Sequence, residues 1–219
     1  MNAIKLIILG GGNSTLEILD IIEDINKKKN QKINVVGILD DRNEIKKKIL
    51  KIPVIGKIKE IKKFKKENFF LSISSYKNRF LREKIIYKTR KFHKRFINII
   101  HPNSLISGNS KIGLNCLINK NTSIYAGSKI GNFCTIQSDV SIAPKSNIDD
   151  NSFIGKSVIV ASNSKVGKNC YLGFNSSILE NVSLSSGTRA LPYSVINKTL
   201  KRKNSVVFGY PAKLISYDK

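Results

Sequence analysis

Short apolar runs and segments of helical periodicity alternate through the first hundred residues. An apolar run at 5–9 leads into three glycines at 10–12, and apolar residues then recur at helical spacing from Leu16 to Ile25. A second strand-like run, 33–39, ends in Asp40 and Asp41. The further predicted elements are a strand at 52–56, a Lys-rich helix near 57–67, a strand at 69–74, an amphipathic helix near 78–94 with Phe80, Leu81, Ile85, Ile86 and Phe92, and a strand at 96–100 before His101-Pro102. This alternation predicts a small Rossmann-like domain over residues 1–100, with a parallel sheet and helices on its faces.

After this domain, an aliphatic residue occurs at every sixth position. Fifteen consecutive positions follow this spacing, so the segment is an internal repeat. The positions are Ile100, Ile106, Ile112, Ile118, Ile124, Ile130, Ile136, Ile142, Ile148, Ile154, Val160, Val166, Leu172, Ile178 and Leu184.

A unit of six residues is too short for a pair of helices and fits one short strand with a turn. A small or slim residue stands two positions before each aliphatic residue from Ile112 on. Glycine often follows the aliphatic residue, as at Gly113 and Gly131, where we expect the turn to need a permissive backbone. Three units make a coil of 18 residues, and stacked coils form a parallel β-helix with strands about 4.8 Å apart. We predict this β-helix over residues 101–196 and a tail at 197–219 that contains a Gly-Tyr-Pro-Ala-Lys turn at 209–213.

The three cysteines fit the core of such a β-helix. Cys116 and Cys134 are 18 residues apart and Cys170 lies 36 beyond Cys134, so all three fall in one column of inward-facing small residues, together with Ser152 and Thr188. His and carboxylate partners do not stand at ligand spacing, and an odd number of cysteines argues against a disulfide framework. We therefore predict packed core thiols and no metal site.

The net charge of +24 comes mainly from lysine, with 32 Lys against 7 Arg. Lysine, isoleucine and asparagine are all abundant and all have A/T-rich codons, so a biased genome accounts for much surface Lys. Proteins that read phosphates and bases favour the bidentate fork of arginine, so the composition argues against nucleic acid as the partner. No apolar run is long enough for a membrane span, and the first residues lack a signal-peptide cleavage site, which makes the cytoplasm the expected compartment.

Taken in order, these parts resemble the bacterial hexapeptide-repeat sugar acetyltransferases. That family includes the UDP-4-amino-sugar N-acetyltransferases of the bacillosamine pathway and the sialic acid O-acetyltransferases. The resemblance covers nearly the whole chain. It rests on LIILGGG at 6–12, GILDD at 37–41, the His101-Pro102 entry to the repeats, the segment GKNCYLGFNSSILENVSL at 167–184, and VVFGYPAK at 206–213.

The resemblance implies a Rossmann-like domain that holds a nucleotide-activated amino sugar, followed by a left-handed β-helix. It also implies a homotrimer and acetyl-CoA as co-substrate, bound between neighbouring β-helices. A glycine turn at a helix N-terminus can bind phosphate, and acids at a strand end can accept hydrogen bonds from a base, a ribose or a sugar amine. A plain turn with solvated acids is the alternative. A dehydrogenase is disfavoured because the third glycine of the dinucleotide fingerprint is missing. The candidate substrate-binding residues are Gly10, Gly12, Asn13, Ser14, Asp40 and Asp41.

The chain departs from the family pattern where the chemistry should occur. Relatives carry Gly-His-Gly where this chain has Asn13-Ser14-Thr15. Their catalytic histidine falls on Pro144, and its acidic neighbour falls on Lys145. We expect structural or surface roles for the two histidines that are present, His93 and His101.

Three explanations are open for the missing histidine. A sugar amine that is partly neutral can attack acetyl-CoA once it is positioned, which favours N-acetylation over O-acetylation. Alternatively, Glu180, which lies two coils from Pro144 at the same corner, serves as a relocated base. Finally, catalysis is lost and the chain is a silent sugar-nucleotide-binding or scaffolding relative.

The coenzyme side is predicted largely from the resemblance. A second family histidine falls on Phe153, and a Gly-x-Gly of the last coil falls on 191–193. The candidate cofactor-binding residues are Phe153, Phe174, Pro192 and Lys213. Basic residues gather in the upper coils and the tail, where they could pair with coenzyme A phosphates or belong to the general surface excess of lysine. They are Lys165, Lys168, Lys198, Lys201, Arg202, Lys203 and Lys213.

Overall fold

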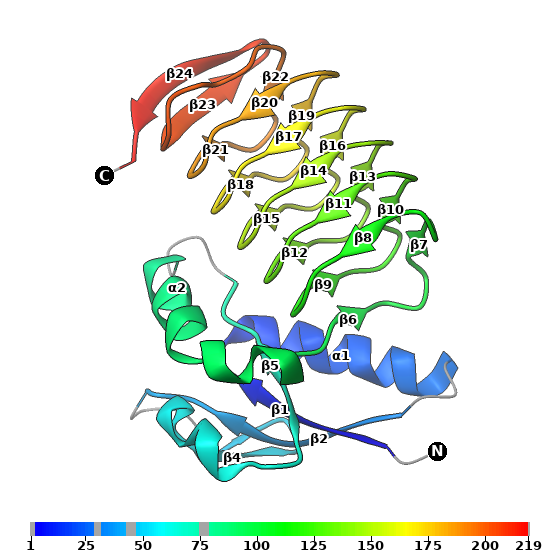
Figure 1. The fold of residues 1–219 in the computed structure, drawn as a ribbon, viewed down its shortest axis with the longest axis vertical. Helices are drawn as coiled ribbons and strands as arrows, with labels where there is room; N and C mark the ends of the chain where they lie inside the picture. Colours follow the sequence, from blue (N-terminus) through cyan, green and yellow to red (C-terminus); the bar gives the residue numbers. More distant parts are fainter. Residues whose placement is uncertain (1–2, 29–31, 43–46, 75–78, 219) are drawn as a thin grey trace. The chain divides into compact units, whose positions relative to one another are not determined.

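The computed structural model of the chain describes residues 3–28, 32–42, 47–74 and 79–218 (Figure 1). The chain divides into two compact units, Met1–Pro102 and Asn103–Lys219. In the described ranges, no helix has both the length and the apolar character needed to cross a membrane.

The first unit is a Rossmann-like α/β domain, as the sequence predicted. Its four parallel strands are β1 (Ile4–Leu9), β2 (Ile33–Leu39), β4 (Ile52–Gly56) and β5 (Asn68–Leu71). A short strand that the sequence did not reveal, β3 (Lys48–Ile49), pairs antiparallel with β4 at the edge. The strand order is β3-β4-β2-β1-β5, so the chain reverses direction across the sheet at β1.

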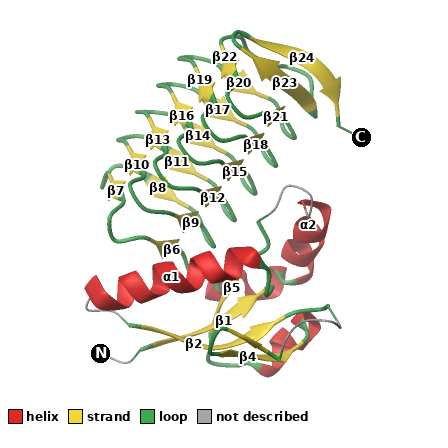
Figure 2. Ribbon diagram, turned by 180° about the vertical axis from the view of Figure 1, so that it is seen from behind, coloured by secondary structure: helices red, strands yellow, loops and turns green. Residues whose placement is uncertain are grey.

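Helix α1 (Asn13–Lys28) lies along this sheet (Figure 2) and buries one face. Its buried residues are Thr15, Ile18, Ile21, Ile22 and Ile25. Leu16, the first apolar position of the predicted stripe, is instead 41% exposed. The helical stripe therefore begins one residue earlier than predicted, at Thr15.

The two later helices are shorter than their sequence patterns predicted. The Lys-rich segment forms only the 3₁₀ helix η1 (Ile58–Lys63), which is consistent with repulsion among its neighbouring lysines. The segment near 78–94 divides into α2 (Arg79–Lys88) and the 3₁₀ helix η3 (Arg90–Arg95). Thr89 stands at the break, where its hydroxyl donates to the carbonyl of Ile85, and such a side-chain bond competes with continued helix.

Both remaining strands of this unit are also trimmed. The strand predicted at 69–74 ends at Leu71, and the hydroxyl of the next residue, Ser72, donates to the carbonyl oxygens of Leu9 and Gly10. The strand predicted at 96–100 is reduced to β6 (Ile99–Ile100). Phe96 nevertheless forms an isolated parallel bridge with Phe69.

The second unit is a parallel β-helix of two-residue strands with three faces. One face holds β7 (Leu105–Ile106), β10 (Ser123–Ile124), β13 (Ser141–Ile142), β16 (Ile159–Val160), β19 (Ser177–Ile178) and β22 (Val195–Ile196). The next holds β8 (Lys111–Ile112), β11 (Lys129–Ile130), β14 (Asn147–Ile148), β17 (Lys165–Val166) and β20 (Ser183–Leu184). The third holds β9 (Leu117–Ile118), β12 (Thr135–Ile136), β15 (Phe153–Ile154), β18 (Tyr171–Leu172) and β21 (Arg189–Ala190), and ends in the hairpin β23 (Ser205–Gly209) and β24 (Ala212–Tyr217).

Residues 18 apart are direct partners on all three faces, as the repeat predicted. Ser123 pairs with Ser141, Lys129 with Asn147, and Thr135 with Phe153. The period-six aliphatic residues are buried from Ile118 to Leu184, each no more than 3% exposed, and Ala190 and Ile196 continue the series. The core of this unit is therefore a stack of aliphatic layers.

The three cysteines are free, buried core residues, as expected from their spacing. Each thiol reaches a carbonyl oxygen of the next coil, as Cys116 Sγ does at 3.0 Å from Gly131 O. Burial raises the pKa of Cys170 to about 12. Ser152 in the same column donates to Gly167 O at 2.9 Å, so Cys and Ser serve the same structural purpose.

The repeat glycines serve a different purpose from the one expected. The left-handed backbone positions of the turns are mostly asparagines, for example Asn151 with φ 58° and Asn169 with φ 58°. Gly113 and Gly131 are not among the residues with positive φ. A Cβ on Gly131 would lie 2.6 Å from the backbone nitrogen of Asp150 in the next coil. These glycines permit the close approach of successive coils.

The close approach at Gly131 leads to a stability prediction. We expect Gly131→Ala to lower the free energy of unfolding by about 2 kcal/mol, because the added methyl must displace backbone of the neighbouring coil. Gly108→Ala is the matched control, since no atom lies within 4 Å of the methyl there, and its effect should stay within about 1 kcal/mol. Urea unfolding of both variants measures this. Equal stabilities would contradict the packing role.

Candidate functional site

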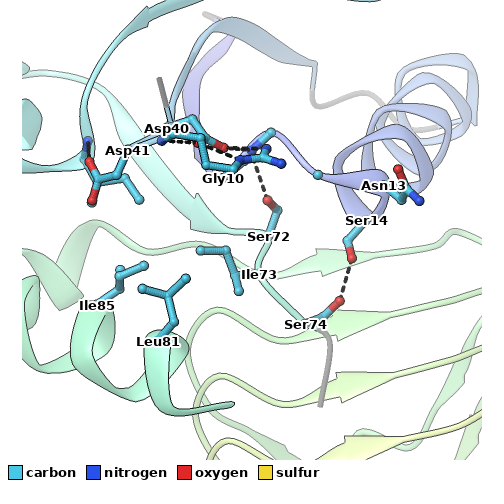
Figure 3. A pocket seen from close by; sticks show the side chains of 14 residues that line it. Gly10, Asn13, Ser14, Asp40, Asp41, Ser72, Ile73, Ser74, Leu81 and Ile85 are labelled. Carbon is cyan, nitrogen blue, oxygen red and sulfur yellow. Dashed lines mark hydrogen bonds and ion pairs between the residues drawn. The ribbon is translucent and has the colours of Figure 1, made fainter. Parts of the chain in front are cut away.

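The first unit contains a pocket of about 440 Å³ at the carboxyl ends of β1, β2 and β5 (Figure 3). β1 lies between β2 and β5, at the point where the strand order reverses, which is where ligands bind in open α/β sheets. The glycine turn, the start of α1, the acidic pair, residues 72–74 and α2 line the pocket. All six candidate substrate residues are among them: Gly10, Gly12, Asn13, Ser14, Asp40 and Asp41.

Asp40 joins two walls of this pocket. Its carboxylate accepts the Gly11 N–H at 2.6 Å and the backbone N–H of Arg42 at 2.9 Å. The Arg42 guanidinium donates twice more, from Nε at 3.0 Å and Nη2 at 2.9 Å. Burial alone would raise the pKa of Asp40, but the hydrogen bonds from Arg42 and Gly11 outweigh it and hold this pKa below its usual value. Asp40 is therefore an ionised group that fixes the glycine turn.

Asp41 fixes the other side of the strand end. Its Oδ1 accepts the backbone N–H of Ile58 at 2.9 Å, and its carbonyl oxygen accepts from Lys57 Nζ at 3.0 Å. Asp41 thus positions the first turn of η1, while its side chain remains exposed to the pocket.

Hydroxyl groups join the start of α1 to the segment after β5, and of these residues the sequence predicted only Ser14. Thr15 Oγ1 donates to Gly10 O at 2.7 Å and lies 2.9 Å from Ser72 Oγ. Ser14 Oγ and Ser74 Oγ are 2.7 Å apart (Figure 3). The Thr15–Ser72 and Ser14–Ser74 contacts join residues 57 and 60 positions apart, so the local sequence pattern gave no signal for them. Gly10 has φ 99° and no room for a Cβ beside Ile73, whereas Gly12 has open space around it.

Two further grooves lie on the β-helix. The first, of about 480 Å³, contains the stacked rings of Phe153 and Tyr171, whose centroids are 5.3 Å apart, together with Phe174. Two of the four predicted coenzyme residues, Phe153 and Phe174, therefore share a groove. Pro192 and Lys213 are not among its lining residues.

The second groove, of about 510 Å³, is basic. Lys165, Lys201 and Lys203 line it beside Thr199 and one acid, Asp149. The rest of the predicted basic cluster lies outside its lining: Lys168, Lys198, Arg202 and Lys213.

The corner that should carry the family histidine holds Pro144 in an exposed turn. The turn is stacked in register with its neighbours, since Lys145 N–H donates to Ala126 O and Asn163 N–H donates to Pro144 O. Glu180 is exposed in the corresponding turn two coils on, about 10 Å away at the spacing of stacked strands.

Both histidines lie away from these three lining sets. His101 is buried and its Nε2 is 3.1 Å from Asp24 Oδ2, while His93 Nε2 is 3.0 Å from Ile86 O. Their contacts agree with the structural role predicted for them. Within the described ranges, no group of three or more His, Cys, Asp or Glu residues is placed to hold a metal ion.

Comparison with known proteins agrees with this architecture. Residues 5–88 match the PglD N-terminal domain, and residues 98–206 match the GMPPB C-terminal domain. A mutant of perosamine N-acetyltransferase from Caulobacter crescentus, solved with CoA and GDP-perosamine, superposes with a TM-score of 0.85 at 20% identity over 97% of both chains. This chain has the fold of the hexapeptide-repeat sugar N-acetyltransferases. Its β-helix is accordingly left-handed, as the resemblance implied.

Two further structures share this acetyltransferase fold. The acetyltransferase domain of PglB from Neisseria gonorrhoeae superposes with a TM-score of 0.85 at 18% identity, over 96% of this chain and 99% of that one. WeeI from Acinetobacter baumannii superposes with a TM-score of 0.82 at 18% identity, over 98% of this chain and 100% of that one. No curated protein sequence matches the chain.

The role of Asp40 can be tested through pH. A carboxyl with a lowered pKa stabilises the fold above its ordinary pKa, near 4, and loses that effect as the pH falls through the folded-state pKa. We expect Asp40→Asn to lower the free energy of unfolding at pH 7 by about 2 kcal/mol, and the difference from wild type to shrink at lower pH. Urea unfolding at several pH values measures this, with Asp20→Asn on the exposed side of α1 as the control. A difference that does not change with pH would contradict the ionised role.

Proposed function

We propose that this protein is an acetyl-CoA-dependent acyltransferase that N-acetylates a nucleotide-linked amino sugar. The reaction takes place in the cytoplasm, and its product serves the synthesis of a surface glycan. The observation that carries the proposal is the superposition, over 97% of both chains, on a perosamine N-acetyltransferase solved with both CoA and GDP-perosamine. The pocket at the strand-order reversal supports it, because that pocket lies within the part of the chain that matches the PglD N-terminal domain.

We assign the nucleotide sugar to the pocket of the first unit. Asn13 and Ser14, at the start of α1, and the Asp41 carboxylate are the polar groups available to it. Gly10, with φ 99°, allows the chain to turn there, and the open space around Gly12 leaves room for a ligand. Asp40 acts from behind them by fixing the turn.

Coenzyme A is assigned to the β-helix. The groove of Phe153 and Phe174 suits the thioester arm, while the basic groove of Lys165, Lys201 and Lys203 suits its phosphates. Pro192 and Lys213 keep their proposed roles beside the coenzyme. A homotrimer, whose neighbouring β-helices would enclose the coenzyme, completes the proposal, and light scattering decides it.

The chemistry proceeds without the family histidine. The sugar amine, in its neutral form, attacks the thioester carbonyl to give a tetrahedral intermediate that is protonated on nitrogen. The C–S bond then breaks as this intermediate collapses to the amide, and the proton lost from nitrogen passes to the departing coenzyme A thiolate or to solvent. Positioning an amine beside the thioester supplies much of the acceleration. A hydroxyl would need a base in the transition state, so Pro144 favours an amine over a hydroxyl as acceptor.

The same residue favours one competing function, a catalytically silent relative that binds the sugar nucleotide or acts as a scaffold. The Caulobacter protein was crystallised with both CoA and GDP-perosamine after a histidine had been replaced. In this fold, ligand binding is therefore compatible with the loss of a histidine.

Release of free coenzyme A separates the two functions. We expect the protein to release free coenzyme A from acetyl-CoA when at least one of a panel of UDP-, dTDP- and GDP-linked amino sugars is the acceptor. A thiol-reactive dye measures the rate, and the hydroxyl analogue of the active sugar is the control acceptor. Binding of a sugar nucleotide without turnover on any amine would leave only the silent relative.

Restoring the histidine provides a second test. We expect Pro144→His to raise kcat by about 100-fold, the contribution typical of a positioned general base, with Pro144→Ala as the matched control. Glu180→Gln should leave kcat nearly unchanged, because the side chain is exposed two coils away. A large fall in kcat for Glu180→Gln, with a changed pH–rate profile, would identify Glu180 as the base instead.

A further inference from the structure

Among the described residues, Arg42 is the one basic side chain that lines the pocket of the first unit, and it was not among the candidates predicted from the sequence. It forms an ion pair with Asp40, 2.9 Å between Arg42 Nη2 and Asp40 Oδ2. The two partners differ sharply in exposure: the Asp40 side chain is 6% exposed and that of Arg42 is 60% exposed. The pair therefore buries its negative member and presents its positive member to the pocket.

Asp40 and the glycine turn of the pocket are engaged with each other. Each oxygen of the Asp40 carboxylate accepts two hydrogen bonds, and the Gly11 N–H points to that carboxylate. Asp41 accepts from Ile58 N–H. Asp40 thus holds the glycine turn and Asp41 holds the start of η1, while Arg42 is the basic group of the pocket lining.

The geometry of the guanidinium leaves a matched pair of donors. Arg42 uses Nε and Nη2 on Asp40. Nη1 and the outer N–H of Nη2 form a second parallel fork, and no described residue accepts from it. Such a fork can donate to two oxygens of one phosphate. A protein carboxylate, by contrast, would bind N–H or O–H donors of the ligand.

The position of the fork also favours phosphate. Arg42 Nη2 and Gly11 N donate to the same atom, Asp40 Oδ2, so the guanidinium stands beside the glycine turn that begins α1. The N-terminus of this 16-residue helix adds partial positive charge on the same side. The buried carboxylate holds the guanidinium in place before any ligand arrives.

We propose that Arg42 binds the diphosphate of the nucleotide-linked sugar and is a specificity-determining residue of the pocket, held in position by Asp40. This inference rests on the proposed function, because the ligand is the substrate assigned there. The sequence predicted phosphate binding at the glycine turn alone, and this inference adds Arg42, the residue that follows the acidic pair, as the side chain that binds the diphosphate.

Binding measurements on the full chain test this role. Calorimetry would compare UDP and GDP with uridine and guanosine, without coenzyme A. We expect Arg42→Gln to weaken binding of the diphosphates about tenfold and to leave the nucleosides unchanged. Arg42→Lys keeps the charge and loses the fork, so its affinity for the diphosphates should lie between those of the wild type and Arg42→Gln. Arg90→Gln removes the same charge outside the pocket and is the control, and thermal melting confirms that each variant is folded.

Three results would overturn the inference. Equal weakening of nucleosides and diphosphates would place Arg42 on the base. Unchanged affinity for the diphosphates would remove Arg42 from the site, and so would a wild-type chain that binds none of the four probes. The failure of the proposed function has a different signature, since a chain that binds diphosphates through Arg42 yet releases no coenzyme A is not a transferase.

Discussion

The 18-residue register of the β-helix governs the second unit. Its short strands have too few hydrogen bonds to be stable singly, so each coil depends on the pairing of every residue with the one 18 positions away. The register fixes columns of equivalent positions, and each column imposes its own requirement. Inward columns take small side chains that reach the next carbonyl, turn columns take residues that tolerate left-handed backbone, and the contact points between coils take glycine.

This register also explains how the chain tolerates so unusual a composition. Lysine occupies outward positions such as Lys111, Lys129 and Lys165, where solvent surrounds it. Asparagine, enriched to 23 residues, fills turns in which the left-handed conformation suits it. A substitution at an exposed corner, including Pro144, costs the fold little.

The first unit depends on a different kind of constraint. Its pocket lies where the strand order reverses, because β2 lies on one side of β1 and β5 lies on the other. The loops that leave these three strands diverge there, and side chains join them. Asp40 joins the glycine turn to the end of β2, Asp41 joins that end to η1, and the Thr15–Ser72 pair joins β1 to β5. The polar groups that look most like ligand contacts therefore maintain the cavity. Arg42, the exposed member of the Asp40 ion pair, is the basic group that lines this pocket.

The sequence by itself determined the repeat, the β-helix, the buried thiols and the order of strands and helices in the first unit, because each of these follows from periodic burial of apolar side chains. It also placed all six candidate residues in one pocket, since the carboxyl ends of parallel strands meet at one edge. Only the tertiary structure decided the helix break at Thr89, the packing role of Gly131 and the partners of Asp40. These depend on contacts between coils, on side-chain bonds that compete with the backbone, and on groups such as Gly11 and Asp40 that lie far apart in the chain, none of which leaves a periodic signal.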